Sequence, residues 1–510
     1  MVAHVQTVSF QGVTAIPVDV QVQIAPGLPA FTIVGLPDKA VAESRERVRA
    51  ALTASGLALP PKRITINLAP ADLPKEGSHF DLPIALGLMV AIGALPSDCL
   101  DDYLILGELA LDGRTASVVG VLPAAIAANG RDEGLICPSD CGPEAAWADP
   151  DMSILAPTSL ISLANHFKGQ QVLSRPKAAI RQAKDNKLNL SDIKGQEVAK
   201  RALEVAASGG HNMVMVGPPG SGKSMLASRL PTILPPLTPK ELLDVSMIQS
   251  MAGLLPQGQL SNARPFRSPH HSASMAAMVG GGARAKPGEV ALAHNGILFL
   301  DELPEFSPQV LDSLRQPIES GEVSISRANH RVSYPSQIQL IAAMNPCRCG
   351  HAGEPGFVCK RGPRCAADYQ ARISGPLMDR IDLRIEVPAV SATDLMLPPP
   401  KEGSKEVALR VAKARAIQKE RYSAKGRPDV LTNAQCPASL IEQVTIPSEG
   451  AMDLLRLAAT SMSLSARGYH RVLKVARTLA DLAEREQPGK EDIAEALSYR
   501  MTSSTSLTMA

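Results

Sequence analysis

Hydrophobic and polar positions alternate with a period of two near the start of the chain. Residues 18–24 read Val-Asp-Val-Gln-Val-Gln-Ile. This alternation predicts a half-buried sheet over residues 2–36. A helix is expected over residues 40–55, where apolar residues recur at helical spacing ahead of Gly56. The same criteria predict three further strands and a buried helix, at 63–68, 104–109, 116–122 and 82–95.

These elements group into an α+β domain over residues 1–165, and a polar, charged linker follows at 166–188. From residue 189 apolar strands alternate with helical segments, which is typical of a parallel sheet covered on both faces. Its strands are expected at 213–216, 297–300 and 338–342. An α/β domain over residues 189–390 and a helical region over 391–510 complete the expected organisation.

Composition excludes several classes of protein. The chain has 510 residues, of which 45% are hydrophobic and 20% charged, so it is not a disordered chain. The 52 Lys and Arg nearly balance the 50 Asp and Glu, so any binding of nucleic acid must come from local basic patches. Only 3% of residues are aromatic, which argues against a single-strand reader that stacks bases. No apolar run reaches the length of a membrane span and no leader sequence is visible, so we expect a cytoplasmic protein without a membrane partner.

A candidate phosphate-binding loop follows the first strand of the second domain. The sequence Gly217-Pro218-Pro219-Gly220-Ser221-Gly222-Lys223-Ser224 comes directly after the predicted strand. Its glycines let backbone N–H groups point at phosphates, Lys223 reaches the β and γ oxygens of ATP, and Ser224 places a hydroxyl on Mg²⁺. The helix that follows turns its positive end toward the anion. An accidental Gly-rich turn is the alternative, but it would not need this strand, loop and helix context.

Two further strands end in residues suited to hydrolysis. Strand 297–300 leads to Asp301, which would complete the Mg²⁺ shell, and to Glu302, which would polarise the attacking water. The third strand leads to Asn345, which could orient the same water. Phosphoryl transfer to water is the implied reaction. An acidic turn, and a turn-forming Asn before Pro346, are the alternatives.

Two arginines are placed to sense the nucleotide. Arg380, just before a predicted strand, could enter a neighbouring subunit's site and stabilise transition-state charge, which would require a homo-oligomer. Arg467, at the start of a helix predicted over 466–482, could contact the γ-phosphate. Surface ion pairs are the alternative for both arginines.

Four of the eight cysteines lie close together in the sequence: Cys347, Cys349, Cys359 and Cys365. In a reducing compartment such clustering is more typical of a metal site than of disulfides. Four soft ligands favour tetrahedral Zn²⁺. The spacing departs from the usual C-x2-C knuckle, and His351 could replace one cysteine. Unligated loop thiols are the alternative.

Three sets of basic residues could contact DNA phosphates without reading sequence. The first is interleaved with the cysteines and comprises Arg348, Lys360, Arg361 and Arg364. The second lies near the tip of a hairpin predicted over 322–332, where Arg327 and Arg331 would line the pore of a ring. The third lies between the two ATP-binding motifs and comprises Arg264, Arg267, His270 and His271. Solvated loop charge is the alternative for each set.

Together these motifs resemble those of the AAA+ ATPases, with Asn345 as sensor 1, Arg380 as arginine finger and Arg467 as sensor 2. A narrower resemblance, to the magnesium-chelatase-like YifB/ComM family, spans nearly the whole chain and is carried by residues 265–271, 302–306 and 344–350. It implies an AAA+ P-loop parallel sheet with a hairpin before sensor 1, a helical lid, and a preceding α+β domain of the Lon-protease-like (ribosomal S5 domain 2-like) type. It also implies a hexameric, ATP-driven branch-migration helicase that promotes recombination of incoming DNA in natural transformation, with recombination proteins as further partners.

Two other functions stay open. Kinship with magnesium chelatase would fit a motor subunit that remodels a partner inserting Mg²⁺ into a porphyrin. A Lon-like ATP-dependent protease is disfavoured, because it needs a serine nucleophile and a lysine base, whereas His79 and Leu122 stand at the corresponding positions. Ser78, in the nearby Gly-Ser turn, is more typical of a helix cap. The N-terminal domain is therefore expected to be a non-proteolytic scaffold.

Overall fold

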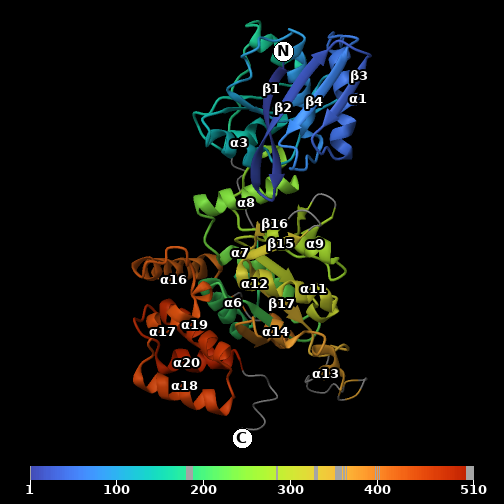
Figure 1. Ribbon diagram of the computed structural model, residues 1–510. Helices are drawn as coiled ribbons and strands as arrows, with labels where there is room; N and C mark the ends of the chain where they lie inside the picture. Colours follow the sequence, from blue (N-terminus) through green and yellow to red (C-terminus); the bar gives the residue numbers. More distant parts are fainter. Residues whose placement is uncertain are drawn as a thin grey trace.

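In the computed structural model an N-terminal α+β unit is stacked on a second unit, which carries the C-terminal helices at its side (Figure 1). The structure describes residues 2–179, 188–282, 285–326, 331–350, 359, 362, 364–396, 398, 400 and 402–500. Buried core residues of the first unit lie between Ala3 and Leu163, and those of the second lie between Leu190 and Tyr499.

A seven-stranded mixed sheet forms the centre of the N-terminal unit, in the order β3-β4-β2-β1-β5-β8-β9. β1 and β2 form a long antiparallel hairpin in which Gln11 pairs with Thr14 across the turn. β4 runs antiparallel to β2, and the other neighbours are parallel. Val18, Val20 and Val22 of β2 are buried, which confirms the predicted alternation. The strands of this unit are β1 (Val2–Gln11), β2 (Thr14–Ala25), β3 (Ala30–Val34), β4 (Arg63–Ala69), β5 (Tyr103–Ile105), β6 (Glu108–Leu109), β7 (Thr115–Ala116), β8 (Gly134–Ile136) and β9 (Ile154–Leu155).

Helices pack against this sheet. α1 begins after Asp38, whose side chain accepts a hydrogen bond from the Val41 N–H at 2.7 Å and so satisfies a free N–H of the first turn. α2 is apolar on all sides because it packs against both the sheet and α1. The helices of the unit are α1 (Lys39–Ala54), η1 (Ser78–Phe80), α2 (Asp81–Ala91), α3 (Val121–Asn129), η2 (Ser139–Cys141), α4 (Gly142–Ala145) and α5 (Leu160–Phe167).

The strand predicted over residues 116–122 is wrong. Only Thr115–Ala116 is a strand, and Val121 already begins α3. Val121 and Leu122 are apolar because they are buried in the first turn of that helix, and so short an apolar run does not distinguish a strand from a helix. The strand predicted over 104–109 is likewise split, into β5 and β6.

The second unit contains a five-stranded sheet in the order β11-β14-β17-β10-β18, and all its strands are parallel. Strands 213–216 and 297–300 are found where they were predicted, and the third lies at 339–344. β15 and β16 form the predicted antiparallel hairpin, and β12 and β13 form another. The strands are β10 (Met213–Val216), β11 (Phe266–Arg267), β12 (Gly280–Gly281), β13 (Lys286–Pro287), β14 (Ile297–Leu300), β15 (Glu322–Ser326), β16 (Arg331–Pro335), β17 (Gln339–Met344) and β18 (Leu383–Glu386).

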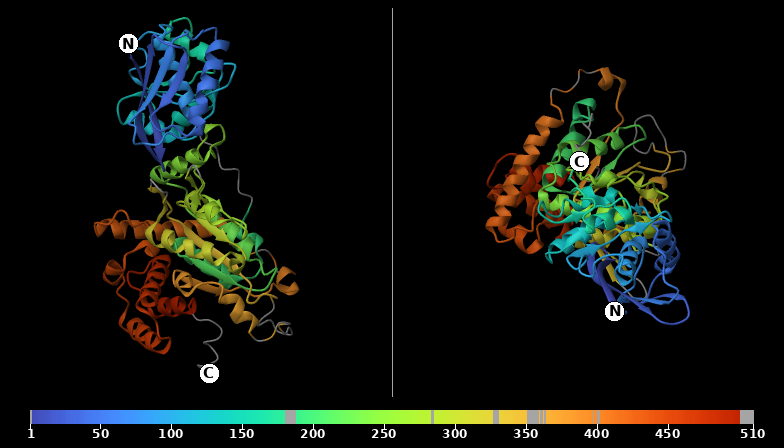
Figure 2. Two further views of the ribbon diagram at one scale, coloured as in Figure 1. Left: turned by 45° about the vertical axis from the view of Figure 1, so that its right-hand side comes forward. Right: turned by 90° about the horizontal axis from the view of Figure 1, so that it is seen from above.

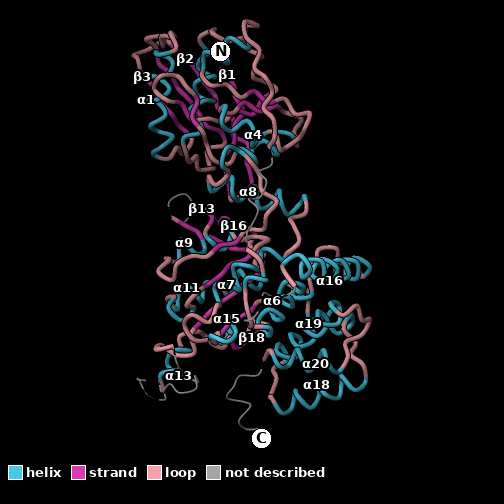
Figure 3. The backbone as a smooth tube through the Cα atoms, turned by 180° about the vertical axis from the view of Figure 1, so that it is seen from behind, coloured by secondary structure: helices cyan, strands magenta, loops and turns pink. Residues whose placement is uncertain are grey.

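Helices surround this sheet, and the C-terminal helices form a group beside it (Figure 3). Those of the sheet region are η3 (Leu190–Asp192), α6 (Glu197–Gly209), α7 (Lys223–Ile233), α8 (Pro239–Ala252), η4 (Pro256–Gly258), α9 (Met275–Val279), α10 (Glu289–Leu292), η5 (Leu303–Glu305), α11 (Pro308–Ser313), α12 (Arg315–Ser320), α13 (Cys365–Gln370) and α14 (Gly375–Met378). The C-terminal group comprises α15 (Ala392–Met396), α16 (Ser404–Ala424), η6 (Asn433–Gln435), α17 (Ala438–Val444), α18 (Glu449–Ser461), α19 (Ala466–Leu482) and α20 (Lys490–Ser498). α19 has the predicted bounds, and it packs against both α20 and α6.

The two units meet at α8 and at the turn of the β1–β2 hairpin (Figure 2). Glu144 is buried there, and its carboxylate accepts hydrogen bonds from the Ser250 hydroxyl of α8 at 2.5 Å and from the Leu122 N–H at 2.9 Å. Burial raises the pKa of this carboxyl. Val13, in the hairpin turn, packs against the core of the second unit. The N-terminal unit is therefore docked on the second by polar and apolar contacts. None of the helices in the described ranges is both long enough and apolar enough to span a bilayer.

Candidate functional site

Three of the predicted nucleotide-binding segments meet at one edge of the second sheet. β10, β17 and β14 are parallel neighbours, so their carboxyl ends face the same way. The phosphate-binding loop follows β10, Asp301 follows β14, and Asn345 follows β17. Open parallel sheets bind ligands at this edge.

Lys223 is folded back onto the loop that precedes it. The loop enters α7 at Gly222, whose φ of +90° lies in the left-handed region that favours glycine. The Lys223 ammonium donates to the carbonyls of Gly217 and Pro218, both at 2.8 Å, and lies 3.4 Å from Asn345 Oδ1. Burial lowers the pKa of Lys223, while two nearby carboxylates act to raise it. A partly buried ammonium held mainly by carbonyls is well suited to an anionic ligand.

Ser224, in the first turn of α7, faces Asp301, which directly follows β14. The Ser224 hydroxyl donates to Asp301 Oδ2 at 2.6 Å, and the other carboxylate oxygen accepts the Glu302 N–H at 2.9 Å. A hydroxyl and a carboxylate that converge in this way are hard oxygen ligands of the kind that Mg²⁺ prefers. The residues therefore fit the cation that accompanies ATP.

Glu302 makes a contact that sequence reasoning missed. Its carboxylate lies 3.5 Å from Nδ1 of His271, in the segment after β11. β11 is the neighbour of β14, so a fourth strand end contributes to the same edge. The sequence groups His271 with basic residues that could contact DNA. Its position beside Glu302 follows from the order of the strands in the sheet, which no local motif reveals.

Neither Arg380 nor Arg467 lies beside the residues at this sheet edge within the same chain. Arg380 precedes β18 and lies at the amino edge of the parallel sheet, opposite the phosphate-binding loop. Its guanidinium donates to the Pro376 carbonyl at 2.8 Å and pairs with Glu319. Arg467 is exposed on the first turn of α19. Among the described residues, no hydrogen bond or ion pair links either arginine to the loop, so their roles as arginine finger and sensor 2 stay predictions.

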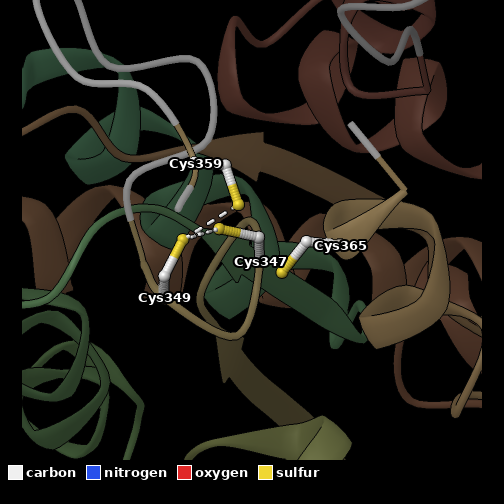
Figure 4. A group of neighbouring side chains, drawn as sticks. All are labelled: Cys347, Cys349, Cys359 and Cys365. Atoms are coloured by element: carbon white, nitrogen blue, oxygen red, sulfur yellow. Dashed lines mark hydrogen bonds between the residues drawn. The ribbon is translucent and has the colours of Figure 1, made fainter. Parts of the chain in front are cut away.

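The four clustered cysteines are turned toward one another (Figure 4). Their Sγ atoms all lie within 4.8 Å of one another. Cys349 Sγ is 3.0 Å from Cys347 Sγ and 3.2 Å from Cys359 Sγ. Cys347 and Cys365 are buried, and the other two are half-buried. With Zn–S bonds of about 2.3 Å, a tetrahedral site has sulfur separations of about 3.8 Å, so small adjustments would bring these thiols around one ion.

Part of the predicted DNA-contact set falls on described residues. Arg331 opens β16 of the hairpin, is exposed, and donates to the Ser324 hydroxyl at 3.3 Å. Arg348 and Arg364 are exposed, each beside a cysteine of the cluster. Three more members of the set lie outside the described residues: Arg327, Lys360 and Arg361.

Arg264 and Arg267 are occupied by ion pairs inside the chain. The guanidinium of Arg264 meets the Glu241 carboxylate at 3.0 and 3.1 Å, and that of Arg267 meets Glu289 at 2.6 and 2.7 Å. Two-pronged pairs of this kind fix geometry as well as charge. They hold the segment before and within β11 onto α8 and α10.

In the N-terminal unit Ser78 donates to the Glu108 carboxylate. Lys75 is buried and donates to the carbonyl of Pro70. Leu122, which faces the core, uses its N–H to reach Glu144. None of the contacts of Ser78 in the described part of the chain pairs it with a lysine.

Three family descriptions match consecutive parts of the chain. "Subunit ChlI of Mg-chelatase" matches residues 20–140, "Magnesium chelatase, subunit ChlI" matches 189–395, and "Magnesium chelatase, subunit ChlI C-terminal" matches 401–500. The chain is 43% identical to competence protein ComM of Haemophilus influenzae, over 98% of this chain and 97% of that protein. It is 42% identical to the uncharacterized protein YifB of Escherichia coli, over 97% of this chain and 96% of that protein. A shorter match, 28% identical over 31% of this chain and 49% of the relative, is to the magnesium-chelatase 38 kDa subunit of Rhodobacter capsulatus.

Proposed function

Because the chain belongs to the magnesium-chelatase-like YifB/ComM family, we propose that it is an ATP-driven motor that assembles as a hexameric ring and moves DNA. In this proposal the protein is a branch-migration helicase that promotes recombination of incoming DNA in natural transformation. The name of the Haemophilus influenzae relative, competence protein, supports the link to transformation.

The observation that carries the proposal is the convergence of Lys223, Ser224, Asp301, Glu302 and Asn345 at one sheet edge. Bound Mg·ATP would supply the γ-phosphoryl group and the cation that neutralises its charge. Lys223 would exchange its loop carbonyls for phosphate oxygens, and Ser224 and Asp301 would hold Mg²⁺. Glu302 would accept a proton from the attacking water, and Asn345 would orient that water.

Assembly into a ring would complete this site. Arg380 lies at the edge opposite its own phosphate-binding loop, so it can serve as an arginine finger only in a neighbouring subunit. It would then give up its pairing with Glu319. The C-terminal helices would act as the lid, with Arg467 as sensor 2 reaching the γ-phosphate.

DNA would follow the exposed basic residues of the second unit. Arg331 on the hairpin, together with Arg348 and Arg364 beside the cysteines, would contact phosphates without reading bases. We propose Zn²⁺ as the ion of the four-cysteine cluster. The N-terminal unit would be a Lon-like scaffold without proteolytic activity, because His79 and Leu122 stand where that chemistry needs a serine and a lysine. The nearby Ser78 hydroxyl is bonded to the Glu108 carboxylate.

An ATPase and branch-migration assay tests the proposal with single-stranded, duplex and four-way-junction DNA. Junction DNA should stimulate hydrolysis, and hydrolysis should move the junction. An Arg331→Ala variant should lower stimulation, whereas Arg45→Ala, which removes an exposed arginine of the N-terminal unit, should not. ATP hydrolysis that no DNA stimulates, without junction movement, would rule the proposal out.

A second candidate is a chelatase-type motor subunit that remodels a partner inserting Mg²⁺ into a porphyrin. The match to the Rhodobacter capsulatus chelatase subunit favours it. A partner-dependent chelatase assay separates the two candidates: metal insertion driven by this chain, with no response to DNA, would support the chelatase.

A further inference from the structure

The four-cysteine cluster lies directly beside the candidate ATP site. Cys347 comes two residues after Asn345, which directly follows β17 and whose Oδ1 lies 3.4 Å from the Lys223 ammonium. Pro346 alone separates the two, and Cys347 is fully buried. A displacement of the Cys347 backbone must therefore also displace Asn345.

A second connection runs through Gly350 to the phosphate-binding loop. The Gly350 N–H donates to the Cys347 carbonyl at 3.0 Å, which closes a turn around the first two cysteines. Gly350 has φ of +88°, and a Cβ there would lie only 2.6 Å from Cδ of Pro219. The cysteine turn thus packs against the phosphate-binding loop with no room for even a methyl group between them.

A third connection runs through α13, which begins at Cys365. Gln370, at its end, donates to the Pro346 carbonyl at 3.0 Å. Two residues further on, Arg372 meets Glu305 at 3.2 Å, in the turn that follows Glu302. The helix therefore joins the last cysteine both to the segment after β17 and to the segment after β14.

We propose that Zn²⁺ held by the four cysteines locks the phosphate-binding loop and the β17 end in place, so that metal occupancy sets the affinity of the ATP site. This inference rests on the nucleotide site of the proposed function. Zinc binding would release the thiol protons to solvent and replace weak sulfur contacts with four Zn–S bonds. Residues 347–350 and α13, which together touch three strand ends, would then be held as one piece.

The chemistry of the ligands favours zinc over other occupants. Four thiolates select soft metal ions and exclude Mg²⁺ and Ca²⁺. Their Sγ atoms lie within 4.8 Å of one another. That spacing suits a single ion, whereas a cluster of several iron atoms would hold its thiolates farther apart.

The test compares metal content with nucleotide affinity in the full chain, with no DNA present. Elemental analysis of the wild type should find one zinc per chain. A Cys359→Ser/Cys365→Ser variant should contain none and should bind a fluorescent ADP analogue about tenfold more weakly. A Cys99→Ser variant, which removes a cysteine outside the cluster, should keep both properties.

Two further measurements separate coupling from loss of folding. Zinc withdrawn from the wild type by a zinc-selective chelator, with Mg²⁺ kept in excess, should weaken ADP binding, and added zinc should restore it. Gly350→Ala, which leaves all four thiols in place, should retain zinc but bind ADP more weakly. Wild-type protein without zinc, iron in its place, or chelated protein that binds ADP as before would each overturn the inference. A failure of DNA stimulation, by contrast, would count against the motor and not against this metal site.

Discussion

Lys223 makes hydrogen bonds to two loop carbonyls, which accept as phosphate oxygens do but carry no charge. A charged phosphate oxygen adds a charge–charge attraction to the ammonium that a neutral carbonyl cannot supply. Burial lowers the pKa of the Lys223 ammonium, and a bound phosphate would stabilise its charged form. Nucleotide binding should therefore depend strongly on this one side chain.

We expect Lys223→Ala to weaken binding of a fluorescent ADP analogue by about 100-fold, since two charge-assisted bonds are each worth about 1.5 kcal/mol or more. Lys39→Ala, at an exposed position in the N-terminal unit, should leave the affinity unchanged. Equal affinities in the two variants would remove Lys223 from the phosphate site.

Glu302→Gln should separate binding from hydrolysis. The amide keeps the size of the side chain but cannot accept a proton from water, so ATP turnover should fall by about 10² to 10⁴ while nucleotide affinity stays within a few-fold. Phosphate release and ADP titration measure the two quantities. Glu449→Gln, at an exposed position on α18, is the matched control. Normal turnover in Glu302→Gln would mean that another group activates the water.

At the scale of elements, the sequence predicts best where a segment is long or carries its own boundary signals. β10, β14 and α19 have the predicted bounds because turn or capping residues flank each apolar run. The two-residue strand β11 is too short to leave a pattern, and α3 begins with a run that also suits a strand. The contacts between His271 and Glu302 and between Gly350 and Pro219 depend on strand order and loop packing, which come from long-range pairing and leave no local pattern. The phosphate-binding loop and the cysteines could be predicted because the chemistry of each lies in a short stretch of chain.

The short helix η1 is bonded to β1 through His79, and this contact should make the stability of the N-terminal unit fall at low pH. His79 of η1 is buried with Nε2 at 2.8 Å from the Val8 carbonyl of β1, and burial lowers its pKa to about 4. An unfolded histidine titrates near 6.5, so the unfolded chain binds more protons between these values. The contribution of neutral His79 to the free energy of unfolding is therefore fully present above pH 6.5. It is lost as the pH falls toward 4, and the loss amounts to about 3 kcal/mol at most.

Replacement of His79 by Gln keeps a donor for Val8 and removes the titration. Urea unfolding between pH 7 and 4 should show a shallower loss of stability in His79→Gln than in the wild type. His4→Gln, which alters an exposed histidine of β1, should retain the wild-type slope. A wild-type slope in both variants would mean that His79 does not charge on unfolding.

At the scale of the whole molecule, the position of Arg380 determines whether one chain can complete its own site for ATP hydrolysis. The nucleotide cluster occupies the carboxyl edge of the parallel sheet, and Arg380 lies at the amino edge. A single chain therefore cannot bring its own arginine to its own γ-phosphate. If hydrolysis requires Arg380, each active site must combine Lys223 of one subunit with Arg380 of the next.

Mixing two inactive variants tests this arrangement. Lys223→Ala and Arg380→Ala should each hydrolyse little ATP alone. When the two are co-expressed and purified through separate tags, the interface between Lys223 of one variant and Arg380 of the other is intact, so random assembly should restore about a quarter of wild-type activity. The matched control mixes Lys223→Ala with Glu302→Gln. Lys223 and Glu302 belong to the same side of the interface, so no combination of these two variants contains an intact site. ATP hydrolysis should therefore stay absent in this mixture. Recovery in the control, or no recovery in the first mixture, would show that the site is not shared between subunits in this way.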